Sequence, residues 1–167
     1  MDYPKFKYIE DCHDILEYNK EGVQCQCCGK ITNFYTEHIY CVEDIDVICD
    51  ECIKSGFACK KFNGSFNEAR KIDNIDAFNE IVHKTPRIPA FQEFIWPDCC
   101  NDMCKYLRLV RLATDKDLED PAIIESLKET WKNQYITLDD LVKFHWADIL
   151  LFQCTHCGKY YANLDQD

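Results

Sequence analysis

The chain has 167 residues, a formal net charge of −11 and 47% hydrophobic residues, which allows one domain or two small lobes and excludes general disorder. No apolar run reaches the roughly 18 residues of a membrane-spanning helix, and Met1 to Lys5 lacks the basic-then-apolar pattern of a signal peptide. We therefore expect a cytoplasmic protein with no membrane association. Its acidic charge repels phosphate backbones, so general nucleic-acid binding is not expected.

The first predicted element is a zinc knuckle, Cys25-x2-Cys28-Gly29-Lys30. A two-residue gap lets both thiolates meet on one tetrahedral ion, and glycine tolerates the positive φ of the tight turn. After 20 residues comes a second pair, Cys49-x2-Cys52. This spacing is typical of a four-cysteine zinc site, so Cys25, Cys28, Cys49 and Cys52 are predicted ligands.

Between and after these pairs, the pattern favours strands followed by a helix. Residues 31–40 are rich in β-forming side chains, and residues 44–48 alternate toward Cys49. A short helix is predicted at residues 52–55, ended by Gly56. Knuckle, hairpin and helix in this order are typical of a treble-clef or zinc-ribbon site.

The middle of the chain contains a turn and a helix. Asn63-Gly64 is the strongest turn signal in the sequence. A helix is predicted over residues 74–83, capped by Asp73 or Asn74 and ended by Thr85-Pro86. Its apolar face is predicted from the spacing of Ile75, Phe78 and Val82.

A second zinc site is predicted from Cys154-x2-Cys157-Gly158-Lys159, which repeats the form of the first knuckle. The predicted partners are Cys100 and Cys104, because a three-residue gap suits one turn of helix. Cys99 in place of Cys100, or His145 or His156 as a ligand, are alternative assignments.

The 49 residues between the two pairs of the second site are predicted to hold helices. One begins at Pro121 after the capping Asp120, with an apolar stripe of Ile123, Ile124, Leu127 and Trp131. Another begins at Thr137. The continuous apolar run at residues 149–152 predicts a buried strand that leads into Cys154.

These elements predict a small α+β protein stapled by two structural zinc ions. The chain is expected to form a single compact domain with two lobes. The N-terminal zinc lobe, residues 1–64, would be treble-clef-like or zinc-ribbon-like, and residues 65–167 would form a mixed helical lobe closed by the second site. Four thiolates fill a zinc tetrahedron and leave no position for a reacting water. No catalytic motif surrounds the histidines, so a binding role is favoured over an enzymatic one.

The order of these motifs resembles the CbrC family of bacterial proteins over roughly residues 4–165. The resemblance rests on motifs spread along the chain: Phe6-Lys7-Tyr8, Cys25-x-Cys27-Cys28-Gly29, Cys49-x2-Cys52-Ile53, the turn at residues 61–66, Cys100-x3-Cys104 and Leu151-Phe152-x-Cys154-x-His156-Cys157-Gly158. The chain departs from the family pattern at Cys99, where histidine is usual, and lacks Pro-Trp between Cys49 and Cys52. The resemblance implies a link to tolerance of a nuclease colicin and implies no catalytic activity.

We therefore expect a non-enzymatic, cytosolic zinc-binding protein that acts in toxin tolerance or stress defence by binding a basic protein such as a toxin. Two tetrathiolate zinc sites would take the charge from −11 to about −15, which makes general nucleic-acid binding still less expected. Two alternative interpretations are an unrecognised hydrolase and a zinc-ribbon regulator that contacts nucleic acid. The basic residues available to that regulator are Lys60, Lys61, Arg70, Lys71, Arg108 and Arg111.

Overall fold

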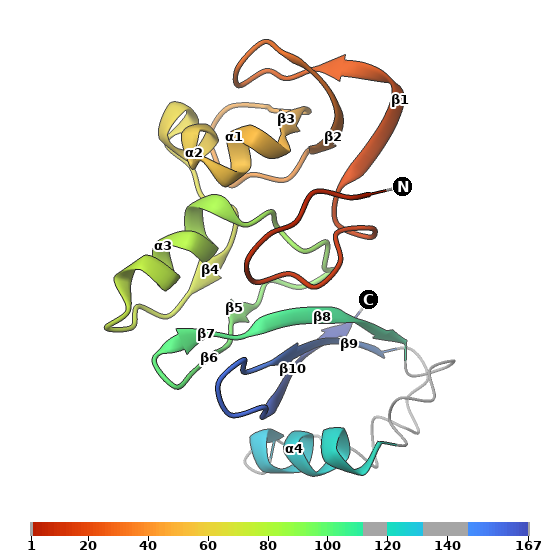
Figure 1. The fold of residues 1–167 in the computed structure, drawn as a ribbon, viewed down its shortest axis with the longest axis vertical. Coiled ribbons are helices and arrows are strands. Elements are labelled where there is room, and N and C mark those ends of the chain that lie inside the picture. Colours follow the sequence, from red (N-terminus) through yellow and green to blue (C-terminus); the bar gives the residue numbers. More distant parts are fainter. Residues whose placement is uncertain (1, 112–119, 132–146, 167) are drawn as a thin grey trace.

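A computed structural model describes residues 2–111, 120–131 and 147–166 (Figure 1). Within these ranges two three-stranded antiparallel sheets have the orders β1-β2-β3 and β10-β9-β8, accompanied by a parallel pair, β4 and β5, and a hairpin, β6 and β7. The elements are β1 (Glu17–Gln24), β2 (Ile31–Thr36), β3 (Ile48–Cys49), α1 (Asp50–Lys54), α2 (Phe57–Phe62), β4 (Glu68–Ala69), α3 (Ile75–Lys84), β5 (Ile95–Trp96), β6 (Asp98–Cys99), β7 (Asp102–Met103), β8 (Lys105–Arg111), α4 (Pro121–Trp131), β9 (Ala147–Gln153) and β10 (Tyr160–Gln166).

The first sheet follows the predicted order of knuckle, strand and helix. β1 pairs with β2 on either side of the first knuckle, and β2 then pairs with the short strand β3. The predicted strand at residues 44–48 is shorter than expected, because only Ile48 and Cys49 join the sheet. α1 begins at once after Cys49, so the second cysteine pair lies at a strand-to-helix junction.

The predicted helix at residues 74–83 is confirmed as α3, and Asn74 is its cap. The Asn74 side chain accepts a hydrogen bond from the backbone N–H of Ala77 at 3.2 Å. The buried face differs from the prediction, since Ala77 and Ile81 are buried whereas Ile75 is 43% exposed. The small Ala77 side chain allows close packing, which a search for large apolar residues overlooks.

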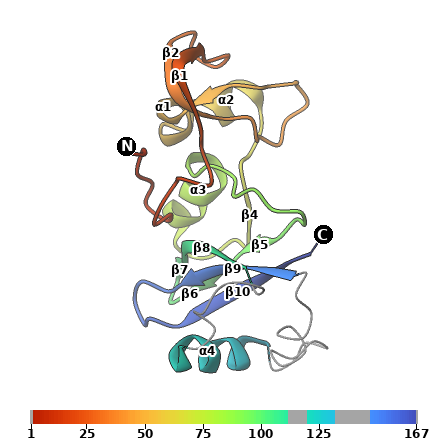
Figure 2. The same ribbon diagram turned by 90° about the vertical axis from the view of Figure 1, so that its right-hand side faces the viewer.

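The apolar side chains of β9 are buried on both faces of the second sheet. Leu150 and Phe152 join the main core, whereas Ile149 and Leu151 pack in a second cluster with Ile123 of α4. Figure 2 shows α4 on one side of this sheet and the rest of the chain on the other. The predicted strand is confirmed, and its lack of alternation is explained by burial of both faces.

The sequence predicts a mixed helical second lobe, and this prediction is confirmed only in part. The helix from Pro121 is confirmed as α4, but residues 105–111, directly after Cys104, form strand β8. The predicted helix from Thr137 lies outside the described residues. Within the described ranges, no helix combines the length and the apolar character needed to cross a membrane.

The N-terminal segment is tied to β8 of the second sheet. The backbone N–H of Tyr106 donates to the carbonyl of Tyr8 at 2.8 Å, and that of Glu10 donates to the Tyr106 carbonyl at 2.9 Å. Phe6, Tyr8 and Ile9 are buried in the same core cluster as residues of both sheets. This segment therefore connects the two zinc-binding regions that the sequence predicts. The boundary between the lobes at residue 64 stays a prediction.

Candidate metal centres

The two knuckles have the same backbone conformation and the same hydrogen bonds. In each, the first cysteine's backbone N–H donates at 2.9 Å to the carbonyl of the lysine five residues on. Gly29 donates to the Cys25 carbonyl at 2.7 Å, and Gly158 donates to the Cys154 carbonyl at 2.9 Å. Both glycines have a left-handed backbone, with φ of 76° and 74°. The turn therefore holds its two thiols on one side, as the sequence predicts.

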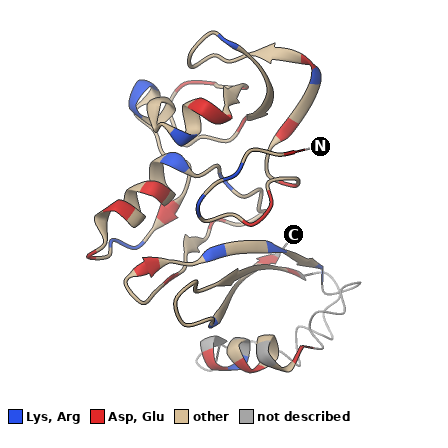
Figure 3. Cartoon of the chain, viewed as in Figure 1, with Lys and Arg blue, Asp and Glu red and all other residues tan. Residues whose placement is uncertain are grey.

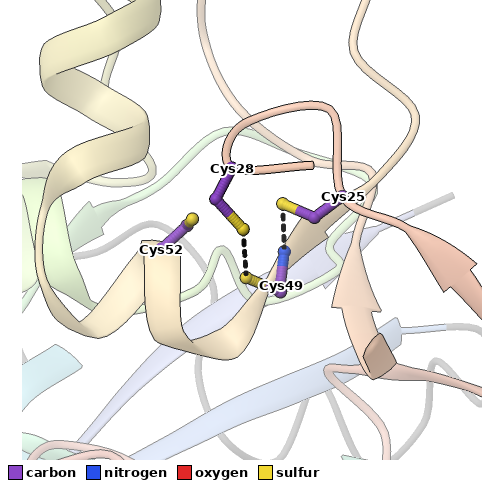
Figure 4. A group of neighbouring side chains, drawn as sticks. All are labelled: Cys25, Cys28, Cys49 and Cys52. Carbon is purple, nitrogen blue, oxygen red and sulfur yellow. Dashed lines mark hydrogen bonds between the residues drawn. The ribbon is translucent and has the colours of Figure 1, made fainter. Parts of the chain in front are cut away.

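The four cysteines of the first predicted site come together. Cys25 and Cys28 lie in the turn between β1 and β2, Cys49 ends β3, and Cys52 lies in α1 (Figure 4). Their sulfur atoms all lie within 4.8 Å of one another. The Sγ atoms of Cys28 and Cys49 are 3.7 Å apart.

These distances fit a metal rather than disulfides. With a Zn–S bond of about 2.3 Å, the sulfurs of a regular tetrahedron are about 3.8 Å apart. A disulfide requires about 2.05 Å. All thirteen cysteines are free thiols in the structure. The first group, which we call tetrad 1 (Cys25, Cys28, Cys49 and Cys52), could thus hold one ion.

The electrostatics of tetrad 1 also favour a cation. Burial works against ionisation of Cys25, but backbone N–H groups, including that of Cys49 at 3.3 Å, bring its thiol pKa below the usual value. Burial raises the pKa of Cys49 to about 12 and raises that of Cys52 as well. The thiols of Cys49 and Cys52 are therefore protonated near neutral pH when no cation is bound. A divalent cation at the centre of the group would displace these protons and offset the negative charge of the thiolates.

A lysine of α2 forms hydrogen bonds to the backbone of the first knuckle. Lys61 Nζ donates to the carbonyls of Gln26 and Cys27 at 2.9 and 2.7 Å. These two carbonyls belong to the x2 residues of the knuckle. Lys61, one of the basic residues considered for nucleic acid, is thus engaged in positioning the turn.

A second group of four sulfurs lies at the other knuckle. We call it tetrad 2, and its sulfurs lie within 4.8 Å of one another: Cys99, Cys100, Cys154 and Cys157. The Sγ of Cys99 is 3.6 Å from that of Cys100 and 3.6 Å from that of Cys157. Cys154 and Cys157 lie in the turn between β9 and β10, and the other two lie in the β6–β7 hairpin.

The fourth sulfur of tetrad 2 comes from Cys99, not from the predicted Cys104. Cys100 and Asn101 both have left-handed backbones, with φ of 54° and 55°, and form the tip of a hairpin instead of a helical turn. Cys104 follows β7 and is fully buried, outside the group. The sequence signal for this is Asn101, because asparagine tolerates the left-handed backbone of a tight turn better than most residues.

The two predicted histidine alternatives do not enter the described tetrads. His156 points to Asp102, with its Nε2 atom 2.9 Å from Oδ2 of that carboxylate. His145 lies outside the described residues. Oδ1 of Asp102 accepts a hydrogen bond from the Tyr8 hydroxyl. Asp102 therefore connects the knuckle, the hairpin and the N-terminal segment around tetrad 2.

Tetrad 2 is the more exposed of the two groups. Cys100 and Cys157 are exposed and Cys99 is half-buried, whereas three of the four cysteines of tetrad 1 are buried. The backbone N–H of Lys159, followed by neighbouring thiols, lowers the pKa of Cys157 to about 7. Tetrad 2 thus contains one thiol that ionises easily at the surface.

Comparisons of the sequence with known proteins identify its family. The model of an uncharacterised protein family, UPF0167, matches residues 3–166. A UPF0167 protein of Pseudomonas aeruginosa is 25% identical over 181 residues, covering 97% of this chain and 96% of the relative. UPF0167 proteins of Mycobacterium bovis and Mycobacterium tuberculosis are each 25% identical over 175 residues, covering 97% of this chain and 92% of the relative. No solved structure matches the chain.

Proposed function

Because the chain belongs to the uncharacterised protein family UPF0167, we propose a function from its own geometry: a zinc-binding protein whose two ions are structural and whose role is to bind another protein. The observation that carries the metal assignment is the pair of groups with four sulfurs each within 4.8 Å. Thiolate-only sets favour zinc over calcium or magnesium. A tetrathiolate zinc has no open position for substrate, so the ions stabilise the fold.

For the first site we propose a treble-clef-like arrangement. A knuckle between two strands supplies Cys25 and Cys28, while the strand-to-helix junction supplies Cys49 and Cys52. This order supports the proposal, because a knuckle and a helix start then face each other across one ion. We assign Cys99, Cys100, Cys154 and Cys157 to the second ion.

For the biological role we propose toxin tolerance or stress defence, on the resemblance to the CbrC family given above. The net charge of −11 supports a basic protein partner. The thirteen free thiols suit the reducing conditions of the cytosol, where we propose that the protein acts.

The metal assignment is tested by elemental analysis of the purified protein. We expect about two zinc ions per chain. One ion per chain would contradict the assignment of the second tetrad, and iron or the absence of bound metal would contradict both. Chelation should unfold the chain, since binding at such sites is coupled to folding. A chain that keeps its fold and its thermal stability after complete metal removal would contradict the structural role.

The binding role is tested separately, by capture of proteins from host lysate at low and high salt on immobilised, zinc-loaded protein. We expect a basic protein that is released as the salt concentration rises. Absence of any protein partner at every salt concentration, or enrichment of nucleic acid instead, would contradict the binding role without affecting the metal assignment.

A further inference from the structure

A cavity of about 700 Å³ opens to solvent beside the N-terminal segment, away from the two tetrads. Its volume lies within the range of pockets that bind small ligands. The residues that carry the argument below are Asp2, Tyr3, Glu10, Asp11, His13 and Tyr18. They come from the segment that precedes β1 and from the first part of β1 itself (Figure 1).

The walls of this cavity are held in place by the core. Cys12, Ile15 and Leu16 are buried, and the backbone N–H groups of Ile15 and Leu16 both donate to the Cys12 carbonyl, at 3.1 and 3.0 Å. The preceding residues are bonded to β8 through Tyr8 and Glu10. A preformed wall reduces the entropic cost of binding a ligand.

Aromatic rings of Tyr3, His13 and Tyr18 line the cavity. Phe34 of β2 lies between two tyrosines, with its ring centroid 4.9 Å from that of Tyr3 and 5.2 Å from that of Tyr18. The ring centroid of His13 is 5.4 Å from that of Tyr3. Tyr18 is 39% exposed, so part of this aromatic surface faces solvent. The faces of such rings attract organic cations.

Carboxylates also line the cavity. Asp2, Glu10 and Asp11 line the cavity together with one ammonium group, that of Lys5. Glu10 is already paired with Lys105, and Asp11 holds the local turn by accepting from the His13 backbone N–H at 3.0 Å. Acidic residues outnumber basic ones in this segment, as in the whole chain, and Figure 3 shows both kinds along it. Aromatic faces beside carboxylates are complementary to an alkylammonium or guanidinium group and repel an anion.

We propose that this cavity receives a lysine or arginine side chain of a basic protein partner. The inference rests on the proposed binding role and gives it a surface and a chemistry. A side chain presented by another surface suits the cavity because the cavity is open, whereas a free metabolite would be held by a more enclosed site.

The test is an NMR titration of the zinc-loaded protein with three probes of similar size: Nα-acetyl-lysine amide, Nα-acetyl-norleucine amide and Nα-acetyl-glutamate amide. The norleucine probe keeps the aliphatic stem and lacks the charge. We expect the lysine probe to shift the signals of Tyr3, Asp11 and Tyr18, with an affinity about tenfold above that of the other two. Asp11→Asn and Tyr18→Leu should each weaken this binding severalfold, whereas Asp44→Asn, at an exposed carboxylate outside the cavity, should not.

Equal binding of the lysine and norleucine probes would overturn the proposal, as would unchanged affinity in both cavity variants. A short lysine-containing peptide should bind at least as tightly as the lysine probe. Binding of free butylammonium combined with no binding of the peptide would overturn the assignment to a protein side chain. Zinc content measured on the same samples, and the lysate capture described above, report on the proposed function independently. If no probe binds, while the protein contains two zinc ions and captures a basic protein from lysate, the proposal for this cavity is rejected. The proposed function is then unaffected.

Discussion

His156 and Asp102 contact each other across tetrad 2, with Nε2 of the histidine 2.9 Å from Oδ2 of the carboxylate. One residue belongs to the knuckle and the other to the hairpin, so the contact joins the two halves of the second proposed metal site. The same carboxylate accepts a hydrogen bond from Tyr8, whose side chain is 1% exposed. Asp102 therefore links the second site to the core through the N-terminal segment.

Asp102→Ala should destabilise the protein by about 2 kcal/mol, because it leaves the buried Tyr8 hydroxyl without its acceptor. His156→Ala is the matched control. The His156 side chain is 55% exposed, so its loss should cost much less. Urea unfolding of both zinc-loaded variants measures the difference. Equal stabilities of the two variants would show that the bond from Tyr8 contributes little.

The sequence predicted most of what depends on local spacing. The cysteine pairs at two-residue spacing, the Asn74 cap and the apolar run at residues 149–152 each describe a short stretch of chain whose geometry follows from its own residues. The knuckle at Cys154 could be predicted from its likeness to the knuckle at Cys25, because both turns need the same glycine.

The rest depends on contacts between distant segments. Cys99 and Cys100 are brought to the second knuckle by a hairpin whose tip has two left-handed residues, and a gap of three residues between cysteines fits a helix equally well. Strand β8 was not predicted because its burial depends on β9 and on the N-terminal segment, which lie far from it in sequence. Tyr3 and Tyr18, which line the cavity, likewise both pack against Phe34 of the neighbouring strand, a contact that their spacing in the sequence does not predict.

The assignment of Cys99 to the second ion is tested by comparing Cys99→Ser with Cys104→Ala. Loss of the Cys99 sulfur should reduce the zinc content from about two ions per chain to about one. Cys104 is buried outside the tetrad, so Cys104→Ala should keep both ions and lose about 1 kcal/mol of stability from the small cavity. The reverse result, with zinc lost only from Cys104→Ala, would restore the assignment made from sequence.

The two proposed ions should differ in their resistance to chelators. Tetrad 2 has two exposed cysteines and one half-buried, whereas tetrad 1 has only one exposed. A chelator in solution replaces an exposed thiolate ligand more easily than a buried one. Zinc release should therefore be biphasic, with the zinc of tetrad 2 released first. Zinc release is monitored with a colorimetric dye in the wild type and in Cys99→Ser, and the comparison assigns each phase to a site. Loss of the slow phase in that variant, with the fast phase retained, would contradict the order.

Two glycines should respond differently to an added methyl group. A Cβ on Gly29 would meet nothing within 4 Å, so Gly29→Ala should cost only the strain of a left-handed backbone, about 1 kcal/mol. A Cβ on Gly64 would lie 2.5 Å from the Tyr40 carbonyl oxygen and 3.0 Å from the Cys41 Cβ. Because Tyr40 is bonded to Ser65 through both its backbone groups, it cannot move away freely. Gly64→Ala should therefore destabilise the protein by about 3 kcal/mol. Urea unfolding of both variants measures the two losses of stability, and a smaller loss in Gly64→Ala than in Gly29→Ala would contradict this packing.

Cysteines outside the tetrads should differ in their reactivity toward iodoacetamide. Burial raises the thiol pKa of Cys12 and of Cys59 to about 12. At pH 8 their thiolate fraction would then be about one in ten thousand, and since only the thiolate reacts, labelling should be very slow. Cys41 is half-buried and should be modified first among the three. Mass spectrometry of the zinc-loaded protein after timed labelling measures the order, with urea-unfolded protein as the control in which all three react. Rapid modification of Cys12 or Cys59 while the fold and both ions are retained would contradict their placement in the core.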